Sequence, residues 1–187
     1  AQKIATNFGF QNKPIVVSTA CISGVSALIS ALRLIQSGKY DHAFVVGGDL
    51  ISKFILSGFQ SFQALSQDLC RPFDKKRNGI NLGEAAGTLL LSCNKSNNNH
   101  NIKITGGSTS NDANHISGPS RTGEELNYAI QQTLKQAGVQ HSDINLISAH
   151  GTATIYNDEM EAKAIHLSKL ENVPINSLKG YWGHTLG

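Results

Sequence analysis

The chain has 187 residues, of which 40% are hydrophobic and 16% are charged, and its formal net charge is +3 at pH 7. A charged share well below the usual value of about 25% indicates that much of the chain is buried in a core. Apart from Lys75, Lys76 and Arg77, the basic residues are scattered, which excludes the dense basic stripe of a nucleic-acid-binding protein.

The cysteine content and the hydropathy exclude further classes. Cys21, Cys70 and Cys93 are too widely spaced for a C-x-x-C metal motif or a disulfide framework. No segment approaches the roughly 18 consecutive apolar residues of a membrane-spanning helix, and the first ten residues lack the apolar core of a signal peptide. These patterns predict a soluble, cytoplasmic protein without a metal site or a membrane contact.

Residues 14–38 predict a strand, a tight turn and a helix. Ile15 to Thr19 is a short, largely β-branched run, and Gly38 is typical of the end of a helix. Between them, apolar residues recur with helical spacing at Val25, Leu28, Leu32 and Ile35. A second buried-type strand at residues 42–46 completes a strand–helix–strand unit, which predicts an α/β fold with a parallel sheet.

Cys21 lies in this predicted turn, directly before the helix. There the unpaired N–H groups and the helix dipole favour a thiolate, which lowers the pKa of a cysteine from its free value of roughly 8.5. The small neighbours Ala20, Ser23, Gly24 and Ser26 leave space for a substrate. The turn alone leaves open the alternative that Cys21 is buried and packs as a small apolar residue.

The middle of the chain gives weaker signals. The aromatic residues Phe54, Phe59 and Phe62 either pack beneath a loop or line a pocket, and Asn78-Gly79 is typical of a hairpin turn. Residues 87–92 predict another strand. The asparagine-rich residues 94–101 cannot support a core, so we expect a polar linker there between domains at 1–93 and 102–187.

The second half predicts another α/β set. Thr122-Gly-Glu-Glu125 has the pattern of a capping box at the start of a helix that Gly138 ends. Asn157 and Asp158 place acidic and polar groups in the first turn of another helix, which reaches about Leu167. We expect strands at residues 102–109, 144–148 and 174–177.

His150 and His184 each follow a predicted strand in a glycine-bearing loop, A-H-G-T-A-T and K-G-Y-W-G-H-T. Each histidine alone is more often structural than catalytic. Together with Cys21, however, they suggest a Cys/His/His centre, because a thiolate can carry an acyl group while two imidazoles hydrogen-bond a developing enolate oxygen.

An ordered series of motifs covers nearly the whole chain. The series consists of T-A-C-I-S-G at 19–24, G-G-D at 47–49, G-F-Q-S-F-Q-A-L-S at 58–66, R-P-F-D at 71–74, G-E-A-A-G at 83–87, H-G-T-A-T at 150–154 and K-x-x-x-G-H at 179–184. In order and separation it resembles the elongating β-ketoacyl-[acyl-carrier-protein] synthases of the thiolase-like superfamily. The resemblance implies a partial thiolase-like α/β fold, layered α/β/α/β/α, with two related halves that are both incomplete here.

The resemblance also implies roles for individual residues. Cys21 looks like the acyl-accepting nucleophile, and His150 and His184 look like the pair that holds the malonyl thioester carbonyl during decarboxylation. Lys179 looks like the residue that orients the histidines electrostatically. Residues that match the phosphopantetheine-binding positions or the acyl and pantetheine channel are Thr152, Thr154, Phe59, His115 and Ser117.

The expected activity is therefore acyl transfer to Cys21 followed by decarboxylative condensation with a malonyl carrier protein. The resemblance implies an acyl carrier protein as partner, a homodimer or a heterodimer with a related subunit, and no cofactor beyond the phosphopantetheine on the carrier. The chain looks like a piece of such an enzyme. The alternatives are an inert fragment, a non-catalytic carrier-binding or dimerisation subunit and, more distantly, a cysteine hydrolase.

Overall fold

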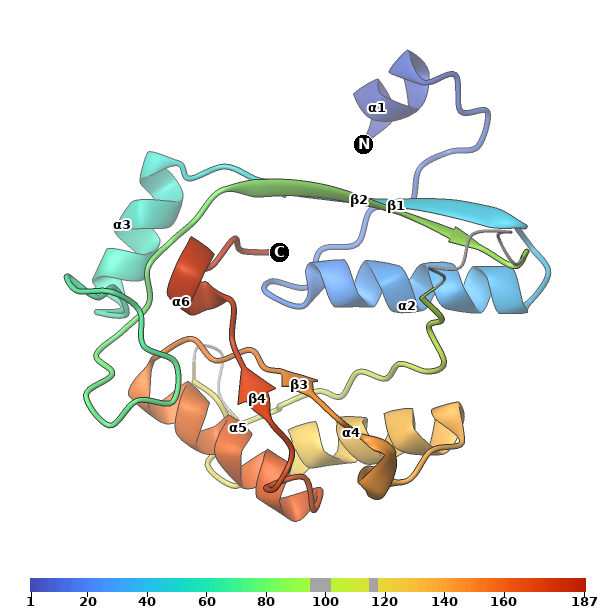
Figure 1. The fold of residues 1–187 in the computed structure, drawn as a ribbon. Helices are drawn as coiled ribbons and strands as arrows, with labels where there is room; N and C mark the ends of the chain where they lie inside the picture. Colours follow the sequence, from blue (N-terminus) through green and yellow to red (C-terminus); the bar gives the residue numbers. More distant parts are fainter. Residues whose placement is uncertain (95–101, 115–117) are drawn as a thin grey trace. The chain divides into compact units, whose positions relative to one another are not determined.

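The computed structural model describes residues 1–94, 102–114 and 118–187 (Figure 1). The expected linker, apart from Asn94, and the predicted site residues His115 and Ser117 lie outside these residues. The helices and strands follow one another as α1 Gln2–Asn7, α2 Ser23–Gln36, β1 His42–Asp49, α3 Lys53–Ser61, β2 Ala85–Ser92, α4 Glu124–Ala137, the 3-10 helix η1 His141–Asp143, β3 Ile147–Ser148, α5 Ile155–Leu167, β4 Ile175–Asn176 and α6 Lys179–Trp182.

The described residues form two compact units. The first contains residues 1–47, 87–94 and 187, and the second contains residues 48–86, 102–114 and 118–186. The division into domains at 1–93 and 102–187 follows the order of the chain rather than these units, and it stays a prediction. None of the helices in the described part of the chain has the length and apolar content needed to cross a membrane.

The first unit confirms the helix that the spacing of apolar residues predicts. Helix α2 buries Ile29 and Ala31, and it ends before Gly38, whose φ of 70° lies in the left-handed region. The strand expected at residues 15–19 is wrong: Ile15 and Val16 are 63% and 72% exposed, and only Thr19 makes a bridge. A strand needs a hydrogen-bonded neighbour, and the structure assigns residues 15–18 to no sheet.

The strand expected at 42–46 is confirmed as β1, which continues through both following glycines to Asp49. The strand expected at 87–92 is confirmed as β2, and it is the hydrogen-bonded neighbour of β1. Beyond β2, the Cys93 N–H donates to the Asp41 carbonyl at 3.1 Å. The sheet therefore joins these two strands, and the strand–helix–strand unit expected from residue 15 onward is not formed.

The core of the second unit lies between α4 and α5, which pack against each other, with a short parallel sheet beside them. Strands β3 and β4 pair Ile147 with Ile175 and Ser148 with Asn176, which confirms both predicted strands in shortened form. Both helices are confirmed, and each presents a buried alanine, Ala129 or Ala164. The sheet points the loops that follow β3 and β4 toward the same edge.

Three local predictions in the second unit are wrong. Helix α4 is capped by Gly123 in a left-handed conformation instead of by the Thr122 box, and residues 102–109 form no strand. Asn78-Gly79 closes no hairpin, because the Gly79 N–H donates to the Ala153 carbonyl at 3.0 Å and Ile80 forms a parallel bridge with Leu65.

The middle aromatic residues lie in helix α3 and at its C-terminal cap. Their exposure agrees poorly with both expected roles, packing beneath a loop and lining a pocket. Phe54 and Phe62 are 88% and 68% exposed, and Phe59 is half-buried.

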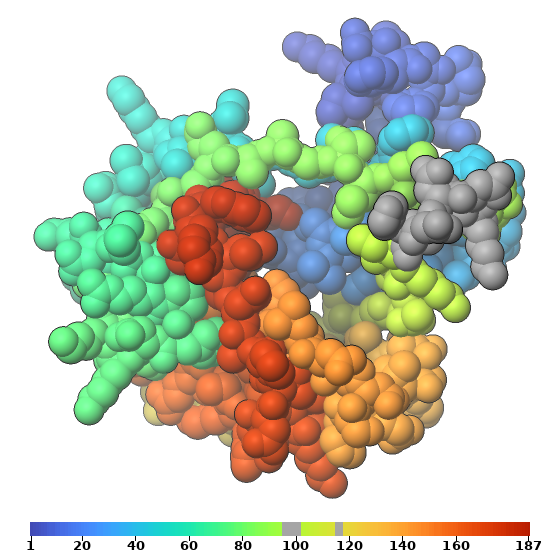
Figure 2. Space-filling model, viewed as in Figure 1, coloured from blue at the N-terminus to red at the C-terminus, as the bar shows by residue number. Residues whose placement is uncertain are grey.

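Helix α6 packs against the segment around Cys70, where a Cβ on Gly180 would lie 3.4 Å from the Cys70 carbonyl oxygen. In Figure 2 the C-terminal residues, in red, lie beside the green residues of this segment.

Replacing Gly123 with alanine tests the α4–α5 contact. Its φ is 78°, and an added Cβ would lie 2.7 Å from the Met160 carbonyl oxygen and 2.8 Å from the Ala164 nitrogen. We expect Gly123→Ala to lower the free energy of unfolding by about 3 kcal/mol, measured by urea denaturation. The control Gly138→Ala has a similar φ of 68° and open space around it, so it should cost only about 1 kcal/mol. Equal losses would contradict the close contact.

Candidate active site

His150 begins the loop that follows β3, and a buried carboxylate from α5 holds its main chain. Glu161 accepts hydrogen bonds from the His150 N–H at 2.7 Å and from the Gly151 N–H at 2.8 Å, one on each oxygen. Burial raises the pKa of Glu161, and these two hydrogen bonds oppose that shift. Because the carboxylate spans both amides, it fixes the direction in which His150 leaves the strand.

His184 lies just beyond α6, and three backbone contacts hold it. Its N–H donates to the Asn81 carbonyl at 2.7 Å, and its own carbonyl accepts from the Gly83 N–H at 2.9 Å. The Leu186 N–H donates to His184 Nδ1 at 2.9 Å. In the neutral ring this places the proton on Nε2, since Nδ1 acts as an acceptor.

The other ring nitrogen of His184 is a buried donor without a protein acceptor. The residue is 3% exposed, and within the described ranges its Nε2 has no hydrogen-bond partner. Leaving such a group unsatisfied is costly, so its presence is typical of a group that waits for a ligand.

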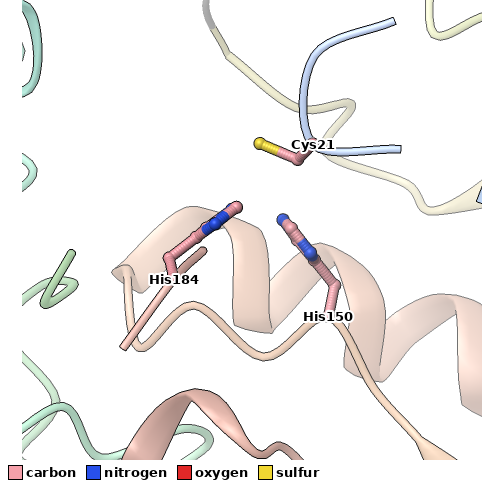
Figure 3. Close-up of side chains that lie close together, drawn as sticks. All are labelled: Cys21, His150 and His184. Carbon is pink, nitrogen blue, oxygen red and sulfur yellow. The ribbon is translucent and has the colours of Figure 1, made fainter. Parts of the chain in front are cut away.

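The two imidazoles lie together, with ring centroids 5.3 Å apart and an interplanar angle of 89° (Figure 3). Burial lowers the pKa of His150 to about 4, with further lowering from the charge of Lys179 and then from His184. Burial and Lys179 likewise lower the pKa of His184 to about 4. Both rings are therefore neutral at pH 7, and each has one N–H to donate.

Lys179, the first residue of α6, is half-buried, and its charge acts on both imidazoles. The role that the resemblance implies for Lys179, orienting the two histidines electrostatically, stays a prediction. The side chains of Thr152 and Thr154 contact each other, with 2.8 Å between their hydroxyl oxygens, and Thr152 is buried. The predicted substrate-binding role of these two threonines remains a prediction, as does that of the half-buried Phe59.

Cys21 belongs to the first unit, where it is exposed and lies in a tight turn before α2. The preceding residue, Ala20, has a φ of 52°, which is a strained conformation for a residue with a side chain. Ser23 Oγ donates to the Ala20 carbonyl at 2.6 Å and accepts from the Thr19 N–H at 2.9 Å. These contacts hold the turn that presents Cys21.

The start of α2 differs from the expected row of unpaired N–H groups. The Ser23 N–H donates to Ala20 at 3.0 Å, and the Gly24 N–H donates to the Gly187 carbonyl at 2.7 Å. The helix dipole remains at this position, but these two amides are already occupied.

Sequence reasoning missed the acidic residues that support the His150 loop. The sequence places Asp158 in the first turn of a helix and gives Glu161 no role, yet both side chains are buried. Asp158 accepts from the Ala153 N–H at 3.1 Å and from the Phe73 N–H at 2.8 Å. Their spacing of three residues, on the helix that follows H-G-T-A-T, is the signal that could have indicated their contacts with this loop.

The substitution Glu161→Gln tests the carboxylate that holds His150. Glu161→Gln replaces one acceptor with an amide donor that faces a backbone N–H, so we expect the free energy of unfolding to fall by about 1–3 kcal/mol. The exposed Glu159 on the same helix forms an ion pair with Lys163 at the surface of the helix. Urea denaturation should show little change for Glu159→Gln, and a similarly small change for Glu161→Gln would contradict the assigned contact.

The pH dependence of stability tests the neutral state of His184. A pKa of about 4 in the folded protein, against 6.5 for an unperturbed histidine, means that the unfolded chain takes up a proton first as the pH falls. His184 therefore lowers stability as the pH drops from about 6.5 toward 4, on the order of 2 kcal/mol at pH 5. Denaturation at several pH values should show a shallower loss in His184→Gln than in the unchanged protein, and parallel curves would contradict the shift.

Comparison with known proteins identifies the family. Models of the β-ketoacyl synthase N-terminal and C-terminal domains match residues 1–97 and 102–187. The 3-oxoacyl-[acyl-carrier-protein] synthase 2 of Staphylococcus aureus is 33% identical over 183 residues, covering 90% of this chain and 45% of its own length. The Synechocystis protein of the same name is 35% identical over 198 aligned positions, covering 98% of this chain and 47% of its own length.

Solved structures agree with these matches. A ketosynthase from Xenorhabdus doucetiae, solved in complex with its chain length factor, is 39% identical with a TM-score of 0.94 over 100% of this chain and 46% of its own. The ishigamide ketosynthase/chain length factor is 33% identical with a TM-score of 0.90, over 100% of this chain and 47% of its own. The chain thus spans about half the length of these relatives. It belongs to the β-ketoacyl synthase family and has part of the thiolase-like fold of those enzymes.

Proposed function

We propose that the protein is a 3-oxoacyl-[acyl-carrier-protein] synthase that elongates acyl chains in fatty-acid or polyketide synthesis. The observation that carries this proposal is the pair of neutral imidazoles, in which His184 keeps a buried Nε2–H without a protein acceptor. A pair of neutral N–H donors suits an oxygen that becomes negative during the reaction, because each ring can donate its hydrogen bond without first changing its protonation state.

In the first half-reaction the thiolate of Cys21 attacks the carbonyl carbon of an acyl thioester on the carrier protein. A new carbon–sulfur bond forms at Cys21, and the phosphopantetheine thiolate leaves and takes up a proton. The tight turn before α2 and the dipole of that helix support a nucleophile at this position.

In the second half-reaction the malonyl thioester loses its carboxylate as carbon dioxide. The electron pair of the broken carbon–carbon bond moves onto the thioester, and the N–H groups of His150 and His184 hydrogen-bond the resulting enolate oxygen. The enolate carbon then attacks the acyl carbonyl on Cys21. The carbon–sulfur bond breaks, and the Cys21 thiolate is regenerated as the product leaves.

Burial and, after it, the charge of Lys179 keep the two imidazoles neutral in this scheme, because both lower the pKa of each histidine. Thr152 and Thr154 are proposed to hydrogen-bond the phosphopantetheine arm, which the carrier protein supplies. The proposed chemistry calls for neither a metal nor a redox cofactor from the protein.

The partners are part of the proposal. One similar structure is a type II polyketide acyl carrier protein in complex with its ketosynthase, and others pair a ketosynthase with a chain length factor. By analogy we propose an acyl carrier protein as substrate carrier and a second, identical or related, subunit as dimer partner. A cytoplasmic location fits a pathway with soluble carrier-bound intermediates.

Intact mass spectrometry with charged carrier proteins tests the proposal. We expect the protein to gain the mass of an acyl group from an acyl carrier protein, and Cys21→Ala to gain none. With malonyl carrier protein added, the acyl group should leave Cys21 as a 3-oxoacyl product. His184→Gln should still be acylated, but its condensation should be about 100-fold slower or more, because one enolate donor is lost.

Three outcomes would overturn this function. Acylation that persists in Cys21→Ala would exclude the proposed nucleophile. Release of free acid without any requirement for malonyl carrier protein would indicate a cysteine hydrolase, and a folded protein that neither acylates nor condenses would indicate a non-catalytic chain.

A further inference from the structure

The main chain of His150 and Gly151 is held from two opposite sides. Glu161 binds both N–H groups, whereas the side chain of Ser177 reaches both carbonyl groups. Ser177 Oγ lies 2.9 Å from the Gly151 oxygen and 3.2 Å from the His150 oxygen. A hydroxyl has a single hydrogen to donate, so Gly151 receives the main bond and His150 shares it.

The sheet register explains why Ser177 reaches this loop. Ser148 of β3 pairs with Asn176 of β4, and the Ala149 N–H donates to the Asn176 carbonyl at 2.8 Å. Ser177 is the next residue, so its side chain continues the contact between the strands at the point where the main-chain ladder ends. The hydroxyl therefore acts on the residues that directly follow β3.

The contact between the two segments is tight. Gly151 has a φ of 44°, and a Cβ placed there would lie 2.6 Å from the Ser177 Cβ. Ser177 is 8% exposed, so water cannot easily replace its hydroxyl. The loop that carries His150 thus has little freedom to move away from β4 while this hydrogen bond is present.

Ser177 also contacts the start of α6, which carries Lys179. Its Oγ accepts a longer hydrogen bond from the Lys179 N–H at 3.4 Å. The same hydroxyl therefore links the His150 loop to the helix whose lysine acts on both imidazoles. The charged or titratable groups that face His150 across this junction are Lys179, His184 and, beneath its main chain, Glu161.

We propose that Ser177 is a positioning residue for the reaction: its hydroxyl fixes His150 relative to His184 and to the start of α6. This inference rests on the proposed function, because the quantity that it controls is the geometry of the enolate donors. A small displacement of a donor weakens the bond to a developing charge far more than it weakens the folded protein. Acyl transfer to Cys21 does not use these donors in the proposed scheme.

The test compares Ser177→Ala with Ser168→Ala. Ser168 is also buried, at 1% exposure, and its hydroxyl donates to Asn127 Oδ1 at 2.8 Å, so its loss removes an equivalent hydrogen bond in the same unit. We expect Ser177→Ala to slow malonyl decarboxylation roughly 10- to 100-fold and to leave acylation of Cys21 nearly unchanged. Ser168→Ala should leave both rates nearly unchanged.

A second variant and a second measurement cover the remaining cases. Ser177→Cys keeps a donor at the same position, although the thiol is larger and donates more weakly, so its decarboxylation rate should fall between those of serine and alanine. It replaces Ser177→Ala if the latter does not fold. Histidine NMR should show an upward change in the pKa of His150 in the Ser177 variants, since the ring is released from the start of α6, and none in Ser168→Ala.

The outcomes separate this inference from the proposed function. Equal rates in Ser177→Ala and Ser168→Ala, or an equal loss of acylation and decarboxylation in Ser177→Ala, would overturn the positioning role. Absence of decarboxylation in the unchanged protein would overturn the proposed function. In that case the pKa of His150 alone decides: an upward change in the Ser177 variants supports the positional link, and no change overturns it.

Discussion

The carboxylate of Glu161 is the contact on which the arrangement of the candidate site depends. It is buried, which raises its pKa and makes its charge costly unless donors compensate. The N–H groups of His150 and Gly151 supply that compensation, so the carboxylate is stable only when the loop takes this path. Asp158, one turn earlier on α5, binds the Ala153 and Phe73 N–H groups in the same way. One helix therefore binds the N–H groups of His150, Gly151 and Ala153 in the loop at residues 150–154.

The state of the two histidines follows from burial and from one lysine. Both effects lower the pKa, so neither ring is protonated at neutral pH. For His184 the Leu186 N–H further selects the form with hydrogen on Nε2. The result is a fixed, neutral and buried donor, and a hydrogen bond from a buried donor to a developing charge is strong. Neutral N–H donors of this kind suit the enolate stabilisation proposed for this chain.

The sequence predicts the long helices well. The spacing of apolar residues indicates α2, Gly138 marks the end of α4, and the polar and acidic residues of its first turn indicate α5. Short elements depend on neighbours that composition does not reveal. Residues 15–19 and 102–109 have strand-like composition but no strand beside them, and the four-residue helix α6 lies in a segment that reads as a glycine-bearing loop. The motifs indicate His150 and His184 individually, but their contact, the inward turn of Glu161 and the hydroxyl of Ser177 depend on packing between distant segments.

In the proposed reaction the two histidines are neutral, and His184 presents its Nε2–H to the substrate. Nitrogen NMR of protein labelled with ¹⁵N-histidine, recorded between pH 5 and pH 8, measures both properties directly. We expect neutral rings for His150 and His184 across this range, with the proton of His184 on Nε2. A ring that becomes protonated near the ordinary histidine pKa of about 6.5, or a His184 with its proton on Nδ1, would contradict it.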